Sequence, residues 1–157
     1  MEVIRKLELS DLNQMLTMRI GIQDYDLPFL NINETKLNRE ELIEKTKSYI
    51  ESHLNKNLHM YGYFIDEELV ANCGFYVDEH FPTYDNPNGL LGYICNVFTK
   101  EEYRGKGYQK KLFGECINSG KEMGITKFKL SSINDKAINM YKAFGFKQVD
   151  NMYCYKV

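Results

Sequence analysis

The sequence predicts an α/β fold in which helices are layered on a mixed β-sheet. Strand-like and helix-like segments alternate along the chain in the order β-α-α-β-β-β-α-β-α-β-β. The 157 residues are 43% hydrophobic and 27% charged, as in ordinary globular proteins. Because no repeat or low-complexity linker interrupts the chain, we expect a single domain over residues 1–157.

The first part of the chain is expected to form one strand and two helices. Residues 2–8 alternate apolar and polar side chains, which indicates a strand. Ser10 is the expected N-cap of a helix whose apolar stripe is Leu12, Met15, Leu16 and Ile20. Residues 23–37 contain a proline and show no period, which favours a loop. Asn38 and Glu41 then have the spacing of a capping box and start the second helix.

The second part is dominated by strands, with two further helices. Residues 60–65 and 69–77 predict a hairpin, and the proline-containing residues 78–89 predict a loop. Later elements are expected at 90–98 (strand), 108–120 (helix), 126–133 (strand), 134–144 (helix), and 146–150 and 152–157 (two short strands).

Charge and composition exclude several classes of protein. The net charge of −2 gives no sign of a nucleic-acid partner. We find no signal peptide and no apolar run that approaches the ~20 residues of a membrane span, so we expect no membrane partner. The four cysteines are widely spaced, which favours reduced thiols over disulfides or a zinc site and predicts no metal. A cytoplasmic location is the resulting expectation.

Residues 104–111, RGKGYQKK, combine two glycines with four cations immediately before a helix. Glycines let the backbone approach a phosphate closely, and the helix start offers N–H donors, so this stretch is a candidate anion cradle. The alternative is a tight βα turn with solvated lysines. A P-loop is excluded because Tyr108 and Gln109 follow Gly107, and the dinucleotide fingerprint is excluded because Lys110 replaces its third glycine.

A second motif lies about thirty residues further on. Asn134, Ala137, Tyr141, Gly145 and Phe146 fit N-x-x-A-x-x-x-Y-x-x-x-G-F. Residues 104–107, R-G-K-G, fit the first four positions of R-x-x-G-x-[GA]. With both motifs in this order, the sequence resembles the GNAT superfamily of acyl-CoA-dependent N-acetyltransferases. The resemblance implies a mostly antiparallel sheet with a V-shaped splay between two parallel strands, here residues 93–99 and 127–133.

The resemblance also implies acetyl-CoA as co-substrate, bound in that splay. Pantetheine would pair with the first strand, pyrophosphate would lie on the glycine loop, and Asn134 would bond the pantetheine. Gln109 stands where the family has a small residue, so its side chain would either crowd the cradle or reach outward. The expected acetyl-CoA-binding residues are Val97, Phe98, Thr99, Arg104, Gly105, Lys106, Gly107, Tyr108, Gln109, Lys110, Asn134 and Ala137.

Tyr141 matches the family's catalytic tyrosine, which gives a proton to the leaving thiolate. The alternative roles are a core aromatic for Tyr141 and a helix N-cap for Asn134. The general base stays open among solvated loop groups (Asp24, Asp26, Asp78, Glu79, His80) and a water chain.

The expected acceptor is a primary amine of a small molecule or peptide. Acids and aromatics in residues 23–37 and 78–89 favour a cationic amine, although two polar surface loops explain them equally well. A non-catalytic acyl-CoA-binding sensor or interaction domain is the alternative function, and the resemblance leaves a homodimer open.

Overall fold

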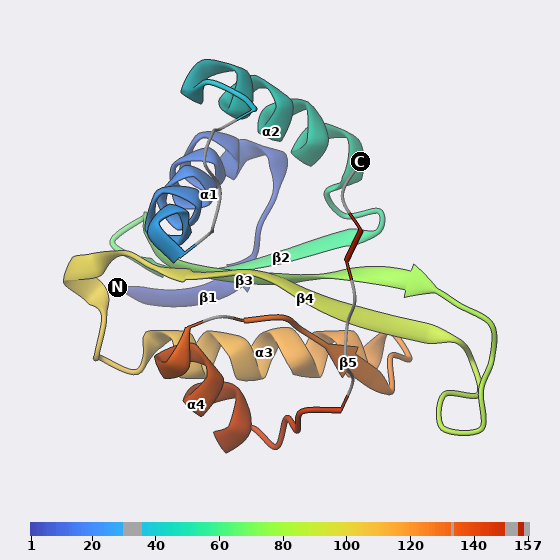
Figure 1. The fold of residues 1–157 in the computed structure, drawn as a ribbon. Coiled ribbons are helices and arrows are strands. Elements are labelled where there is room, and N and C mark those ends of the chain that lie inside the picture. The colour runs from blue at the N-terminus through green and yellow to red at the C-terminus, as the bar shows by residue number, and fades with distance from the viewer. Residues whose placement is uncertain (30–35, 133, 150–153, 156–157) are drawn as a thin grey trace.

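A five-stranded sheet forms the central layer of the protein (Figure 1). The computed structural model describes residues 1–29, 36–132, 134–149, 154 and 155. The strands are β1 (Glu2–Lys6), β2 (Leu58–Ile65), β3 (Glu68–Glu79), β4 (Leu90–Thr99) and β5 (Lys127–Lys129). They lie in the order β1-β2-β3-β4-β5; the first four pair antiparallel, and β5 pairs parallel with β4. The predicted mixed, mostly antiparallel sheet is confirmed.

Helices cover both faces of this sheet (Figure 1). On one face lie α1 (Leu12–Asp26) and α2 (Arg39–His53), and on the other lie α3 (Tyr108–Glu122) and α4 (Asp135–Ala143). Each face has its own apolar core, one containing Met15, Met18 and Ile50 and the other Phe75, Phe113 and Cys116. None of the helices in the described ranges is both long and apolar enough to cross a membrane.

The start of α1 differs from the prediction. Ser10 is not the cap, because a short 3₁₀ helix, Leu9–Asp11, precedes α1 and begins with a capping box between Glu8 and Asp11. Asp11 accepts hydrogen bonds from Arg5 at 2.7 Å and from the Glu8 N–H at 3.0 Å. A charged residue contributed by β1 therefore fixes this helix start. By contrast, the capping box of Asn38 and Glu41 is confirmed at the start of α2.

The predicted loop over residues 23–37 is wrong in its first part. Helix α1 continues to Asp26, and the 3₁₀ helix Leu27–Phe29 follows; residues 30–35 lie outside the described part. Pro28 does not interrupt α1 because it stands beyond Asp26, at the start of the following 3₁₀ helix, and proline is tolerated in the first turn of a helix.

The short strands expected near the C-terminus are not seen. Residues 146–149 have no regular secondary structure; nor do residues 154 and 155, and residues 150–153, 156 and 157 lie outside the described part. The Phe146 N–H is already engaged, since it donates to the Tyr141 carbonyl at 3.1 Å and closes the end of α4. Gly145, with φ of 97°, supplies the left-handed turn that makes this closure possible.

Candidate active site

The parallel strands β4 and β5 separate soon after they meet. Their pairing is restricted to Leu91–Tyr93 against Lys127–Lys129, so the strand predicted over 126–133 is shorter than expected. Beyond Tyr93, β4 and the segment that follows β5 diverge, and a cavity of about 770 Å³ opens between them. We call it the splay groove. It is lined by residues 93–99 of β4, 130–132 after β5, and parts of α1, α3 and α4.

A β-bulge at Asn96 shapes the β4 side of the splay groove. The register of β3 against β4 shifts between Asn72 and Gly74, and Asn96 has a φ of 52°. Asparagine tolerates this left-handed conformation better than most residues, and a bulge bends its strand. The Asn96 Oδ1 accepts a hydrogen bond from Arg19 Nη1 of α1 at 2.9 Å. Asn96 is not among the site residues predicted from the sequence; its signal there is a polar residue within the apolar run LLGYICNVF.

The start of α3 leaves its backbone donors open to the splay groove. Gly105 and Gly107 have φ of 77° and 80°, and Gly107 is an N-cap without a side chain to accept from the helix. Among the described residues, none of the main-chain N–H groups from Gly105 to Lys110 has a hydrogen-bond partner. No atom lies within 4 Å of a Cβ built at either glycine. This arrangement can accept an anion.

Gln109 takes neither of the orientations expected from the sequence. Its Oε1 accepts from Thr99 Oγ1 at 2.9 Å, and its Nε2 donates to the Asn72 carbonyl at 3.3 Å. The side chain therefore lies against the sheet, where it joins α3 to β3 and β4. The backbone donors of the α3 start are left unobstructed by it.

Arg104 folds back over the splay groove. Its Nε donates to the Thr99 carbonyl at 3.0 Å, and its guanidinium carbon lies 4.8 Å from the Tyr25 ring centroid and 5.6 Å from that of Phe98. Lys106 instead lies with its Nζ 5.2 Å from the Tyr103 ring centroid. Arg104 lines the groove and Lys106 does not.

Asn134 is a helix N-cap, the alternative role expected for it from the sequence. As N-cap of α4, its Oδ1 accepts from the N–H groups of Lys136 at 2.9 Å and Ala137 at 3.2 Å. Its Nδ2 donates to the Tyr25 hydroxyl at 2.9 Å, which connects α4 to α1 across the groove. The Asn134 amide is therefore engaged within the protein at both of its ends.

Tyr141 belongs both to the core and to the wall of the splay groove. It is only 7% exposed, and its ring centroid lies 5.5 Å from that of Phe113. Burial, with smaller contributions from Cys73 and Asp26, raises its pKa to about 12. The described residues offer no hydrogen bond to its hydroxyl, which is protonated at neutral pH and available to a bound molecule.

Asp26 is the one carboxylate among the described residues that line the splay groove. It is half-buried, and desolvation raises its pKa while the charge of Arg19 opposes the rise. Asp24 instead pairs with Arg39 at 2.9 Å. The remaining candidates for the base, Asp78, Glu79 and His80, contribute nothing to the lining.

The splay groove brings together most of the residues singled out in the sequence. It is lined by all the expected acetyl-CoA-binding residues except Lys106, and also by Tyr141. In the part of the chain that the structure describes, no group of three or more His, Cys, Asp or Glu side chains could hold a metal ion.

Comparisons with known proteins agree with this geometry. The chain belongs to the acetyltransferase (GNAT) family, whose profile matches residues 23–146. It is 25% identical over 84 residues to thialysine N-epsilon-acetyltransferase of Sus scrofa, a match over 52% of this chain and 49% of that protein. The chain thus spans about half the length of the curated relative that it matches.

Two solved structures share the whole fold. A predicted acetyltransferase from Clostridium acetobutylicum, crystallised with acetyl-CoA, has a TM-score of 0.85 at 22% identity and covers 99% of this chain and 96% of its own. A GCN5-related N-acetyltransferase from Ralstonia eutropha JMP134 has a TM-score of 0.83 at 17% identity, with 99% of each chain covered. At these identities the likeness establishes the fold.

Proposed function

We propose that this protein transfers an acetyl group from acetyl-CoA to a primary amine of a small molecule or peptide. One observation carries the proposal: the open start of α3, the protonated Tyr141 and the carboxylate of Asp26 all border one groove. Family membership supports acetyl transfer. The name of the pig relative, an N-acetyltransferase, supports a nitrogen acceptor.

In this proposal, acetyl-CoA binds along the splay. Its pyrophosphate accepts hydrogen bonds from the free N–H groups of Gly105 to Lys110, with Arg104 and Lys110 as counter-charges. The pantetheine pairs with the backbone of Val97 to Thr99, where β4 has no β5 partner. The Asn134 amide can hydrogen-bond pantetheine only when its bond to the Tyr25 hydroxyl is broken. Otherwise Asn134 contributes through its main chain.

The proposed reaction is direct attack. Asp26 removes a proton from the ammonium form of the acceptor, and the amine lone pair forms a bond to the thioester carbon. The carbon–sulfur bond then breaks, and Tyr141 donates its proton to the departing thiolate. The nitrogen loses a further proton to solvent as the amide forms. Tyr141 then regains a proton from solvent, and Asp26 releases its proton to solvent. The products are an N-acetylated amine and the free thiol of CoA.

Ligand binding and thiol release test the function as a whole. Acetyl-CoA at one hundred times its Kd stabilises a protein by about 2.7 kcal/mol, which a thermal-shift assay detects. Acetyl-CoA is expected to raise the Tm more than dephospho-CoA or ATP, and a panel of primary amines is expected to accelerate thiol release. An unchanged Tm would contradict acetyl-CoA binding. Binding without release for any amine would favour a non-catalytic acyl-CoA-binding domain.

Replacing Tyr141 tests the proposed acid. Tyr141→Phe is expected to lower kcat by roughly 100-fold, as loss of a general acid does, while the Kd of acetyl-CoA stays unchanged. Tyr63→Phe is the matched control. The pKa of Tyr63 is also raised to about 12, mainly by its hydrogen bond to Glu2 and secondarily by burial, but Tyr63 lies outside the splay groove. Equal turnover in Tyr141→Phe and the wild type would remove Tyr141 from the mechanism.

Replacing Asp26 tests the proposed base. A base acts in its ionised form, so kcat/KM should fall as the pH drops through the Asp26 pKa, which burial has raised. Asp26→Asn is expected to abolish this acid limb and to lower kcat by roughly tenfold or more. Asp24→Asn, which breaks a pair outside the groove, should keep the wild-type profile. An acid limb that survives Asp26→Asn assigns the base to another group.

A further inference from the structure

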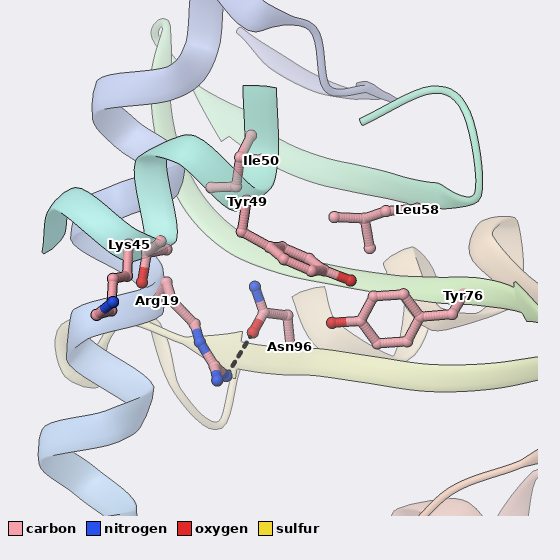
Figure 2. A pocket seen from close by; sticks show the side chains of 8 residues that line it. Arg19, Lys45, Tyr49, Ile50, Leu58, Tyr76 and Asn96 are labelled. Atoms are coloured by element: carbon pink, nitrogen blue, oxygen red, sulfur yellow. Dashed lines mark hydrogen bonds between the residues drawn. The ribbon is translucent and has the colours of Figure 1, made fainter. Parts of the chain in front are cut away.

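A second cavity lies between α1, α2 and the sheet face opposite α3 (Figure 2). It has a volume of about 240 Å³, and we call it the α1–α2 pocket. Ile50 and Leu58 give it an apolar floor. The rest of its lining consists of groups that can donate hydrogen bonds: Arg19, Lys45, Thr46, Tyr49, Tyr76 and Asn96.

The charge of the α1–α2 pocket is one-sided. Arg19 and Lys45 line it, and no carboxylate does among the described residues. Within the same described part of the chain, neither cation forms an ion pair, although the neighbouring Arg39 of α2 pairs with Asp24 of α1. A pocket with two cations that form no ion pair within the described residues, and with several donors, fits an anionic group such as a carboxylate or a phosphate.

The donors around the pocket are held in position. Arg19 is fixed by its hydrogen bond to the bulge residue Asn96, drawn as a dashed line in Figure 2. Because Asn96 Oδ1 is taken by Arg19, its amide nitrogen is the group left to donate. The Tyr49 and Tyr76 rings meet edge-on at 6.3 Å, and in Figure 2 their hydroxyls point toward one another in the pocket.

The α1–α2 pocket adjoins the splay groove. Arg19 and Asn96 line both cavities, so a group held by Arg19 in the pocket lies next to the groove. Arg19, Ile22 and Asp26 share one face of α1, at the spacing i, i+3 and i+7. Arg19 and the proposed base are seven positions apart in the helix, which places their Cα atoms about 10 Å apart.

We propose that the α1–α2 pocket binds an anionic group of the acceptor, a carboxylate or a phosphate, while its amine lies near Asp26. The acceptor class is therefore an ω-amino acid or ω-amino phosphate, whose two charges are several bonds apart. This inference rests on the proposed function, and it replaces a purely cationic amine with a molecule that carries both charges.

Matched acceptors test the proposal. Thiol release is measured with hexylamine, 6-aminohexanoate and 6-aminohexyl phosphate, which share one alkyl amine and differ in the anionic end. At least one anionic acceptor is expected to have a kcat/KM roughly tenfold or more above that of hexylamine. The ratio of kcat/KM between 6-aminohexanoate and 6-aminohexyl phosphate shows whether the pocket prefers a carboxylate or a phosphate. Lys45→Gln and Arg19→Gln should each reduce this preference, mainly through KM. Lys47→Gln, on the same helix outside the pocket, should retain it.

Binding of ligands without an amine keeps the proposal separate from the catalytic one. Calorimetry with hexanoate and hexyl phosphate is expected to detect binding that weakens in Lys45→Gln but not in Lys47→Gln. Such binding with no acetylation of any amine would overturn the proposed function and keep the anion site. Absence of binding, or equal binding to both variants, would overturn the anion site, as would equal kcat/KM for the three amines.

Discussion

Helices α3 and α4 both begin at the splay groove, but their starts are built differently. At α3, the cap is Gly107, which offers no side-chain acceptor, and the first turn carries Lys110 and then Lys111. At α4, the cap is Asn134, which accepts from two N–H groups, and Asp135 follows in the first turn. One start thus leaves donors and positive charge unpaired, while the other satisfies both internally.

The difference indicates which start is built to receive a ligand. The N-terminus of a helix carries partial positive charge, so lysines there are unfavourable and an acid is favourable. The α4 start is arranged for stability. The α3 start is arranged against it, and under the proposed function an external anion supplies the negative charge and the acceptors that its own residues lack. The following predictions test this comparison, from the largest expected effect to the smallest.

A carboxylate placed at the open start should have the largest effect. Under the proposed function, Gly107→Asp puts a negative charge within reach of the pyrophosphate, and two unit charges about 4 Å apart near a surface repel by about 4 kcal/mol. The Kd of acetyl-CoA, measured by calorimetry, is expected to rise by roughly 1,000-fold.

The control is Gly124→Asp at the other end of α3. Gly124 has a φ of 87°, so backbone strain is comparable in the two variants. Since residue 124 does not line the groove, the Kd should stay near the wild-type value. Equal losses of affinity in both variants would mean that strain, and not the lost anion site, explains the result.

Removing the Asn134 cap of α4 should reduce the stability of the protein first of all, and its affinity for acetyl-CoA second. Asn134→Ala is expected to lower the free energy of unfolding by about 1 kcal/mol. Asn38→Ala, which removes the corresponding cap of α2, should lower it by a similar amount. Urea denaturation measures both losses. The Kd of acetyl-CoA should rise several-fold in Asn134→Ala alone; a rise of the same size in Asn38→Ala would contradict a specific role for Asn134.

Shortening Gln109 should have the smallest effect on binding. Its side chain bonds Thr99 and Asn72, so Gln109→Ala is expected to reduce stability by about 1 kcal/mol. Because that side chain leaves the backbone donors open, the Kd of acetyl-CoA should change less than about threefold, under 0.7 kcal/mol. A larger change would show that the amide itself contacts the ligand.

Local signals predicted much of the fold and part of the site. The capping box of Asn38 and Glu41 depends on residues three apart, and the glycines at 105 and 107 mark their own left-handed turns. Long-range contacts decided the rest. The partner of Asn96 is Arg19, 77 positions away, and the orientation of Gln109 depends on a β3 carbonyl. No local period in the sequence contains either contact.

Tyr25 connects parts of the molecule that the proposals assign to different ligands. Its hydroxyl accepts a hydrogen bond from Asn134 of α4, and its ring lies against Arg104, which precedes α3. Tyr25 itself belongs to α1, the helix that also carries Arg19 and Asp26. Under the two proposals, a displacement of Tyr25 by acetyl-CoA would therefore act on α1, the helix that also faces the acceptor. Coupling of this kind is reciprocal: if acetyl-CoA changes the affinity for the acceptor by some factor, the acceptor changes the affinity for acetyl-CoA by the same factor.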